Sequence, residues 1–267
     1  MRNKRLVLIG NNKGMETLCN FFCVRPEIKV VGLVHSSKTG SELTAQKYAD
    51  KYEISRIFHP RRKDQDQYLH FLSKIRNLHP DLAICYSYDR IFDEDFLSIF
   101  NGEVYNLHGA MLPKYRGQNV LNWVLINGEE STGMTLHKVN LGIDSGPIVY
   151  QKEIKINFED TAVTLKNKMD SKVLEILESF LPDIVSNAIK TKDQDETLST
   201  YFHKRYPSDG KIDWNKPALD IYNLIRALVT PWPGAYYIKD NKKYVINSFM
   251  KLEDVEKMQK EMNYLQS

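Results

Sequence analysis

The sequence predicts an α/β protein built on a mostly parallel sheet, with a small α+β unit at its C-terminal end. Three observations support this prediction. Short, continuous apolar runs recur through the first half of the chain, as in strands that are buried on both faces. Stretches with apolar residues at helical spacing separate these runs, and the last third of the chain is rich in aromatic residues and proline. Alternating strands and helices are typical of a parallel sheet that is covered by helices.

The elements of the first half follow one another in a regular order. Gly10 ends the first apolar run, and Pro26 and Pro80 end two of the helical stretches because proline cannot continue a helix. Strands are expected at Leu6–Ile9, Val30–Val34, Ile54–Phe58, Leu82–Tyr86 and Val104–His108, and helices at Met15–Phe22, Thr44–Tyr52, Tyr68–Leu78 and Val120–Ile126.

The second half contains two alternating segments and a long helical one. Met134–Val139 alternates apolar and polar residues, which predicts a strand with one exposed face. Ile148–Ile156 alternates in the same way and could pair with it antiparallel. The region Thr164–Ile189 is expected to be helical, with an interruption or a change of direction at Pro182.

A polar segment divides the chain. Residues 190–199 are rich in Asp, Lys and Thr, which favours a linker. We therefore expect an N-terminal domain of residues 1–190 and a small C-terminal domain of residues 200–267. The closing stretch Leu252–Leu265 suits an amphipathic helix, which could pack on its own domain or serve a homodimer interface.

Composition and charge exclude several classes of protein. The 37 Lys and Arg residues against 34 Asp and Glu give a net charge of +3, too small to indicate a nucleic-acid partner by itself. No apolar run approaches the roughly twenty residues of a membrane span, and the run before Gly10 is too short for a secretory signal. Cys19, Cys23 and Cys85 fit buried thiols of a reduced protein. A cytoplasmic protein without nucleic-acid or membrane partners is the expectation.

The turn after the first expected strand reads Gly10-Asn11-Asn12-Lys13-Gly14. The backbone N–H groups of such a strand-to-helix turn could meet an anion. The turn matches neither G-x-G-x-x-G nor a phosphate-binding loop, so a plain structural turn is favoured. The sequence also contains no H-E-x-x-H, G-x-S-x-G or kinase signature, so nothing in it indicates metal or serine-nucleophile chemistry.

Residues that suit acid–base chemistry gather between Tyr105 and Gly146. Asn106 and His108 lie two apart in an expected strand, so they share a face and place an amide donor beside a titratable base. Asp144 lies in a turn flanked by glycines. Each has an ordinary structural explanation when taken alone, because strand-end histidines pack in cores and aspartates form turns.

The ordered spacing of these residues resembles the signature of the folate-dependent formyltransferase family. The chain carries N-L-H at residues 106–108, L-P-K-Y-R-G at residues 112–117, and then Asp144. The family includes the glycinamide ribonucleotide, methionyl-tRNA and nucleotide-sugar N-formyltransferases. The resemblance covers residues 1–190, is sharpest between Ser87 and Gly146, and implies a Rossmann-like catalytic domain.

A second block is similar to the segment that follows the catalytic domain in nucleotide-sugar formyltransferases. It comprises R-Y-P-S-D-G-K-I-D-W from Arg205, N-L-I-R-A-L from Asn223 and P-W-P-G-A from Pro231. The tRNA enzymes share part of this block but continue into a longer β-barrel, whereas only about thirty residues follow Gly234 here. The short tail favours a sugar substrate, and the resemblance implies a dTDP-linked 4-amino-4,6-dideoxyglucose, or a 3-amino relative, in O-antigen synthesis. A methionyl-tRNA formyltransferase and a non-catalytic nucleotide-binding module are the alternatives.

The resemblance also implies a co-substrate and roles for the site residues. N10-formyltetrahydrofolate would supply the formyl group to a primary amine, with no metal. Asn106 would donate to the developing oxyanion, and His108 would move the proton. Asp144 would hold His108 and favour its charged form.

Two further sets of residues are expected to bind the two substrates. The pterin is expected against main-chain groups of Arg90, Ile91, Phe92, Asn140, Leu141, Gly142, Ile143 and Asp144. Substrate contacts are expected from Lys13, Lys114, Tyr115, Arg116 and Trp232, and Arg226 could also meet phosphate. Packing within their own loop is an equal alternative for Tyr115 and Arg116. Gln118 replaces the arginine found in the aminoarabinose enzyme, which speaks against a UDP-aminoarabinose substrate.

Overall fold

A computed structural model describes residues 3–264 of the chain, and Leu265, the expected end of the last helix, lies outside them. The chain forms two compact units, each assembled from three stretches of sequence. The first unit comprises Met1–His108, Thr135–Gln151 and Val173–Asp195, and the second comprises Gly109–Met134, Lys152–Lys172 and Glu196–Ser267. The division into residues 1–190 and residues 200–267 stays a prediction.

Within the described residues, seven strands form one sheet in the order β3-β2-β1-β4-β5-β7-β8. The strands are β1 (Lys4–Gly10), β2 (Ile28–His35), β3 (Ser55–Phe58), β4 (Leu82–Tyr86), β5 (Val104–His108), β7 (Ser131–Lys138) and β8 (Ile148–Lys155). The pairs β1–β2, β2–β3, β1–β4 and β4–β5 are parallel, and β5–β7 is antiparallel. The predicted α/β fold with a mostly parallel sheet is confirmed.

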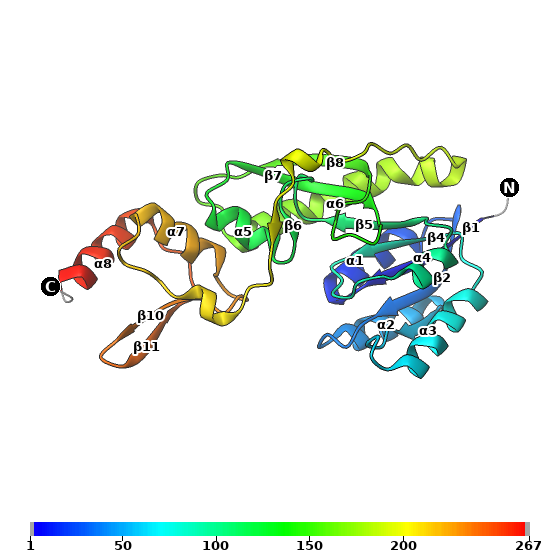
Figure 1. Ribbon diagram of the computed structural model, residues 1–267, viewed down its shortest axis with the longest axis horizontal. Helices are drawn as coiled ribbons and strands as arrows, with labels where there is room; N and C mark the ends of the chain where they lie inside the picture. Colours follow the sequence, from blue (N-terminus) through cyan, green and yellow to red (C-terminus); the bar gives the residue numbers. More distant parts are fainter. Residues whose placement is uncertain (1–2, 265–267) are drawn as a thin grey trace. The chain divides into compact units, whose positions relative to one another are not determined.

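Helices connect the parallel strands, as the alternation predicts (Figure 1). They are α1 (Asn12–Phe22), α2 (Ser41–Tyr52), α3 (Gln65–Asn77) and α4 (Glu94–Ile99). The sequence analysis missed α4. Its start carries an ordinary signal, because the Asp93 side chain caps the helix by accepting from Phe96 N at 2.9 Å.

The long helix α6 (Ala162–Ser186) runs as one helix through Pro182, so the expected interruption is wrong. Proline removes the backbone donor that would bond to the carbonyl four residues earlier, which belongs to Glu178. Pro182 and Glu178 are both exposed, so the unpaired carbonyl is not stranded in the core. The proline also lies near the C-terminal end of the helix, where few turns depend on it.

The second unit is mixed α and β. Its further elements are β6 (Arg116–Gly117), α5 (Val120–Ile126), β9 (Tyr201–Phe202), α7 (Ala218–Ala227), β10 (Ala235–Lys239), β11 (Lys242–Ile246) and α8 (Leu252–Tyr264). Helix α7 packs against α5 and α8. Strands β10 and β11 form an antiparallel hairpin, and its two turn residues, Asp240 and Asn241, both have positive φ (48° and 57°). Aspartate and asparagine are the side chains that tolerate this turn best after glycine.

Between residues 3 and 264, no helix combines the length and the apolar character that crossing a membrane would require.

Candidate active site

Four polar side chains lie on one face of the sheet where β5 and β7 pair. Asn106 is directly opposite His137, and His108 is opposite Thr135. Cross-strand partners and residues two apart in a strand share a face, so all four point the same way. Leu107, between them, is buried with 3% of its surface exposed. The prediction that Asn106 and His108 share a face is confirmed.

Asp144 reaches this face from the loop that follows β7. Its Oδ2 lies 3.5 Å from His108 Nδ1. Its Oδ1 lies 3.4 Å from Asn106 Nδ2 and 3.4 Å from His137 Nε2. The fold thus brings together the three residues that the resemblance places in the reaction, although Asp144 is 38 positions from Asn106.

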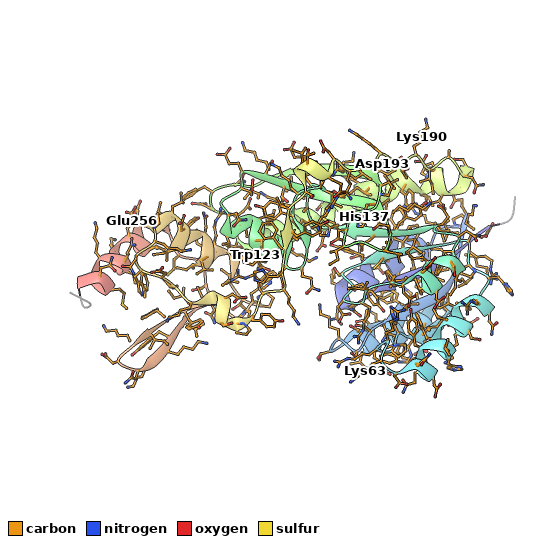
Figure 2. All side chains as sticks on the ribbon, viewed as in Figure 1. Lys63, Trp123, His137, Lys190, Asp193 and Glu256 are labelled. Carbon is orange, nitrogen blue, oxygen red and sulfur yellow. The ribbon has the colours of Figure 1, made fainter. Side chains whose placement is uncertain are left out.

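His137 is a member of this group that the sequence analysis missed (Figure 2). The side chain is 2% exposed, and its Nδ1 lies 3.0 Å from the carbonyl oxygen of Lys138. A carbonyl only accepts, so Nδ1 carries a proton, and Nε2 lies 3.2 Å from Asn106 Nδ2 and 3.4 Å from Asp144 Oδ1. His137 therefore contacts both the amide and the carboxylate of the cluster. Its only signal in the sequence is the alternation of Thr135 and His137 in one strand.

The polar segment after α6 also contacts this site. Lys192 and Ile148 exchange two backbone hydrogen bonds of 2.8 Å, which fixes the segment alongside the start of β8. Two residues further on, Gln194 Nε2 donates to the carbonyl oxygens of Asp144 at 2.8 Å and Gly146 at 2.7 Å. The first part of the expected linker is therefore built into the first unit. The sequence analysis missed Gln194, since a glutamine in a polar stretch gives no local signal.

A buried network ties together the ends of β1, β2 and β4. Asn11 is 2% exposed, donates to Asp89 Oδ1 at 2.9 Å, and accepts from Ser36 N and Oγ at 3.1 Å each. Burial raises the pKa of Asp89, but hydrogen bonds from Ser36 and Asn11 outweigh it and lower this pKa below its usual value. Gly14 packs so closely here that a Cβ would lie 2.4 Å from the Tyr86 carbonyl oxygen. Such packing gives the Gly10–Gly14 turn a structural role.

The two loops expected to hold a pterin present apolar side chains to solvent. Ile91, in the loop after β4, is 79% exposed, and Leu141 and Ile143, in the loop after β7, are 63% and 53% exposed. Large apolar side chains in solvent are suited to cover a flat ring system. Arg90 donates to Ser37 Oγ at 2.8 Å, and Phe92 is buried in the core.

Cys85 of β4 is paired with Asn106, so it lies on the same face of the sheet. It is buried, and burial together with the nearby charge of Asp144 raises its pKa. A thiol in this environment stays protonated and is not a nucleophile. Within residues 3–264, no group of three or more His, Cys, Asp or Glu side chains is arranged to hold a metal ion.

Comparison with known proteins shows the family to which the chain belongs. A family model described as "Formyl transferase" matches residues 9–181, more than half of the chain. The chain belongs to the formyl transferase family. A second model, described as the formyl transferase C-terminal domain, matches residues 205–261. The resemblance to this family that the N-L-H and L-P-K-Y-R-G motifs carry is therefore confirmed.

Proteins similar to this chain include a curated protein and several solved structures. Bifunctional polymyxin resistance protein ArnA from Wigglesworthia glossinidia brevipalpis is 44% identical over 212 residues, which are 79% of this chain and 32% of ArnA. The chain thus spans about a third of that relative's length. WlaRD, a sugar 3N-formyl transferase solved in the presence of dTDP and 5-N-formyl-THF, is 23% identical with a TM-score of 0.72 over 91% of this chain and 85% of that one. An N-formyltransferase from Helicobacter canadensis, solved with folinic acid and dTDP-3-aminofucose, is 24% identical with a TM-score of 0.70 over 91% and 86%.

The residues expected to bind the substrate differ in exposure. In the first unit, the Lys13 side chain is 64% exposed and pairs with Glu16 at 3.0 Å. In the second unit, Lys114 is exposed and Trp232 is half-buried.

Tyr115 and Arg116 of the L-P-K-Y-R-G motif, both expected to contact the substrate, are buried in the second unit. Arg116 is fully buried, and its guanidinium donates to both carboxylate oxygens of Glu196, at 2.6 and 2.8 Å, and to the Tyr201 hydroxyl at 2.6 Å. Tyr115 stacks on Phe202 with ring centroids 4.5 Å apart. These contacts favour the packing role for both residues.

Arg226 is also buried in the second unit, with 4% of its surface exposed. Its Nε donates to Asn223 Oδ1 at 2.8 Å, and Nη1 donates to the Asp160 carbonyl oxygen at 3.0 Å. The guanidinium therefore holds two segments of the second unit together.

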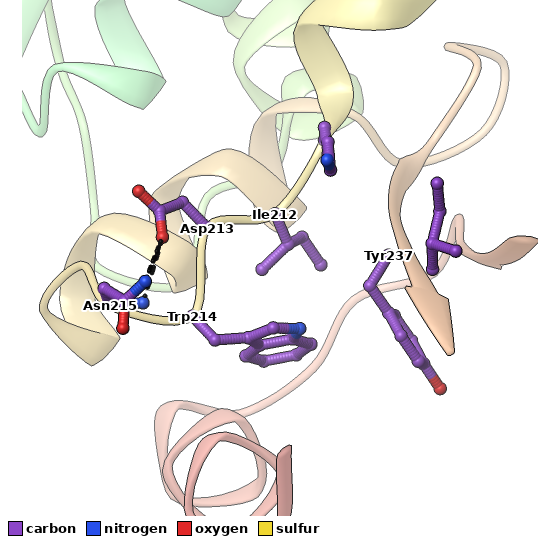
Figure 3. Close-up of a pocket in the computed structure, with 7 residues that line it drawn as sticks. Ile212, Asp213, Trp214, Asn215 and Tyr237 are labelled. Carbon is purple, nitrogen blue, oxygen red and sulfur yellow. Dashed lines mark hydrogen bonds between the residues drawn. The ribbon is translucent and has the colours of Figure 1, made fainter. Parts of the chain in front are cut away.

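The second unit contains a pocket of about 430 Å³ (Figure 3). Its walls are formed by Lys211, Ile212, Asp213, Trp214, Asn215, Tyr237 and Ile238. Asp213 Oδ1 accepts from the backbone and side-chain nitrogens of Asn215, at 3.1 Å each. Trp214 meets Tyr237 edge to face, with ring centroids 5.5 Å apart. None of the residues expected to bind substrate or co-substrate lines this pocket.

Proposed function

We propose that this formyltransferase moves the formyl group of N10-formyltetrahydrofolate to the amine of a nucleotide-linked amino sugar. The observation that carries the proposal is the cluster of Asn106, His108 and Asp144, in which the carboxylate lies within 3.5 Å of both the amide donor and the imidazole. The acceptor that we favour is dTDP-4-amino-4,6-dideoxyglucose or a 3-amino relative, for O-antigen synthesis. Two solved relatives, WlaRD and the Helicobacter canadensis enzyme, carry dTDP or a dTDP-amino sugar together with a formylated folate.

The cluster can perform the proton and charge movements that this reaction needs. When bound, the formylated folate supplies the formyl carbon, to which the acceptor amine forms a new C–N bond while the bond to the folate nitrogen breaks. Asn106 Nδ2 would donate to the formyl oxygen as negative charge develops on it. The 3.4 Å contact of Asn106 Nδ2 with Asp144 is long for a hydrogen bond, so replacing it by a hydrogen bond to the formyl oxygen would cost little free energy.

His108 would carry the proton. Its Nδ1 faces Asp144, so Nε2 is the atom that would take a proton from the amine and pass it to the leaving folate nitrogen. Asp144 would stabilise the imidazolium that forms between these two steps, because an opposite charge at short distance favours the protonated ring. His137 contacts the Asn106 amide and the Asp144 carboxylate.

The two apolar loops suit the folate. Main-chain groups of residues 90–92 and 140–144 would bind the edges of the pterin, and Ile91, Leu141 and Ile143 would cover its faces. For the nucleotide sugar, Lys13 and Lys114 are the exposed cations of the expected set, and Trp232 is the aromatic platform. Tyr115 and Arg116 would act by holding the segment that carries Lys114.

The proposal also covers organisation and location. We propose that residues 1–190 act as the catalytic domain and residues 200–267 as a small accessory domain, in a cytoplasmic enzyme that acts without nucleic acid or membrane. A homodimer is part of this proposal, and sedimentation of the purified protein tests it.

An acceptor panel tests the function directly. The enzyme is incubated with N10-formyltetrahydrofolate and a set of dTDP- and UDP-amino sugars, with charged initiator tRNA in a parallel arm, and the products are separated by liquid chromatography. Formylation of one sugar nucleotide supports the proposal and identifies the acceptor. Formylation of tRNA alone refutes it, and folate binding without transfer to any acceptor indicates a non-catalytic binding module.

Variants of the cluster test the assigned roles. His108→Ala and Asp144→Ala are expected to lower kcat by about 10²–10⁴ with the fold intact, because the proton carrier is lost or unsupported. Asn106→Ala is expected to cost about 10²–10³ in kcat through the lost oxyanion donor. His70→Ala, which removes an exposed histidine on α3, serves as the control. Near-wild-type turnover in any of the three cluster variants would refute that residue's role.

A further inference from the structure

The loop that carries Asp144 is exposed, and its own side-chain hydrogen bonds run to Asn140 Oδ1, from Gly142 N at 3.1 Å and from Ser145 Oγ at 3.0 Å. Asn140, Leu141, Gly142 and Ile143 are all exposed, so packing does not fix the approach to Asp144. Asp144 itself has a φ of +48°, a left-handed conformation that costs a non-glycine residue roughly 1 kcal/mol. Its carboxylate must nevertheless stay within 3.5 Å of groups on the sheet.

Gln194 contacts this loop through its side-chain amide. The two hydrogen bonds from Nε2, 2.8 Å to the Asp144 carbonyl and 2.7 Å to the Gly146 carbonyl, use both amide protons. The glutamine is anchored in turn, because Lys192 is paired with Ile148 two residues earlier. The backbone at Gly146 is packed so tightly that a Cβ would lie 1.8 Å from the Lys138 carbonyl oxygen. The amide therefore joins Asp144 to a rigid point of the loop.

We propose that Gln194 is a positioning residue that holds the Asp144 carboxylate against His108 and Asn106. This inference rests on the proposed role of Asp144 in formyl transfer. Gln194 acts through the loop backbone and does not touch the reacting atoms. Its loss removes none of the reacting side chains but lets the Asp144 carboxylate drift, and displacements of about 1 Å in a catalytic constellation cost about 10²-fold in rate.

The test uses two substitutions at position 194 and a matched control. Gln194→Leu keeps the side-chain volume and removes both donors. Gln194→Glu keeps the shape and places a carboxylate against two carbonyl oxygens, so it donates only when protonated. The control is Gln259→Leu, because Gln259 Nε2 makes the same kind of double contact, 2.7 Å to each of the carbonyls of Trp214 and Lys216, in the second unit.

Kinetics with the acceptor identified by the panel give the first readout. Gln194→Leu is expected to lower kcat about 10–100-fold while the KM for the amino sugar stays within about twofold of wild type. Gln194→Glu is expected to regain part of its activity relative to wild type as the pH falls, since protonation restores a donor. Gln259→Leu is expected to keep the wild-type kcat. A wild-type kcat in Gln194→Leu, or equal loss in Gln259→Leu, overturns the inference.

Hydrogen exchange gives a second readout that needs no substrate. Backbone amides of residues 140–146 are expected to exchange faster in Gln194→Leu than in wild type, whereas Gln259→Leu leaves that segment unchanged. Unchanged exchange in Gln194→Leu would refute the claim that Gln194 holds the loop. Faster exchange with an unchanged kcat would refute the claim that holding the loop matters for catalysis. A wild-type enzyme that formylates no acceptor refutes the proposed function and the catalytic part of this inference, while the exchange experiment still decides whether Gln194 holds the loop.

Discussion

His59 is expected to make the stability of the protein sensitive to acid. The residue follows β3 and is 3% exposed; its ring stacks on Phe71 with centroids 4.4 Å apart. Its Nδ1 lies 2.7 Å from the hydroxyl of Tyr88, in the loop that continues to Arg90 and Phe92. Burial, aided by the charge of Arg90, lowers the pKa of His59 from 6.5 to about 4.

The direction and size of the effect follow from this pKa. Above pH 6.5 the imidazole is neutral in both the folded and the unfolded chain. Between pH 6.5 and about 4 the unfolded chain binds a proton that the folded one excludes, so stability falls as the pH falls and levels off below about 4. A difference of about 2.5 units corresponds to about 3 kcal/mol, of which about 2 kcal/mol is lost between pH 8 and pH 5.

Urea unfolding of wild type and His59→Phe at about pH 8 and about pH 5 measures this effect. Circular dichroism is the suitable probe, because His59 lies in the first unit whereas all three tryptophans lie in the second. At the higher pH the variant is expected to be about 1–3 kcal/mol less stable, since the Tyr88 hydroxyl loses its partner. Between the two pH values it is expected to lose about 2 kcal/mol less than wild type.

An exposed histidine provides the control for the His59 experiment. His70→Phe removes an exposed histidine of α3 and is expected to follow the wild-type curve at both pH values. Equal losses of stability in wild type and His59→Phe would refute the reasoning, because the buried imidazole would then bind its proton as readily as the unfolded chain does.

Two further predictions concern stability. Asp160→Asn is expected to lower the free energy of unfolding by about 2 kcal/mol at neutral pH: burial raises the pKa of Asp160, but hydrogen bonds, chiefly from Lys168, lower it below 3.8. Wild type loses this contribution as the pH falls from above 3.8 through the lowered pKa of Asp160. Urea unfolding followed by tryptophan fluorescence is therefore expected to show the free energies of unfolding of wild type and Asp160→Asn converging in acid. A constant difference between the two proteins at every pH would contradict this prediction. Gly14→Ala is expected to destabilise by about 1–3 kcal/mol, because overpacking against the Tyr86 carbonyl outweighs the gain of about 1 kcal/mol in helix propensity. Gly109→Ala, whose Cβ would meet no atom closer than 3.5 Å, is the control for thermal unfolding, and a stabilised Gly14→Ala would contradict the clash.

Elements with strong local signals could be predicted from the sequence. The apolar run at Leu6–Ile9 lies within β1, and Val104–His108 is β5 in full. The shared face of Asn106 and His108 follows from the two-residue period of any strand, whatever the strand pairs with. The short helix α4 carried a cap at Asp93 that could have been found by the same reasoning.

The rest of the site depends on contacts between residues far apart in the sequence. His137 meets Asn106 across 31 positions because β5 and β7 pair in one register, and a shift of one residue would turn His137 to the other face. Gln194 meets Asp144 across 50 positions because the segment after α6 returns to the start of β8. No local pattern specifies either contact.

The sequence by itself determined the alternation of strands and helices, the family, and the identity of three residues at the site, because periodicity and motif spacing are local properties of the chain. Only the tertiary structure decided that Arg116 is buried against Glu196, that His137 contacts Asn106 and that Gln194 donates to the Asp144 carbonyl. The physical reason is that local propensities act over a few residues, whereas strand register and loop closure are fixed by the packing of the whole unit.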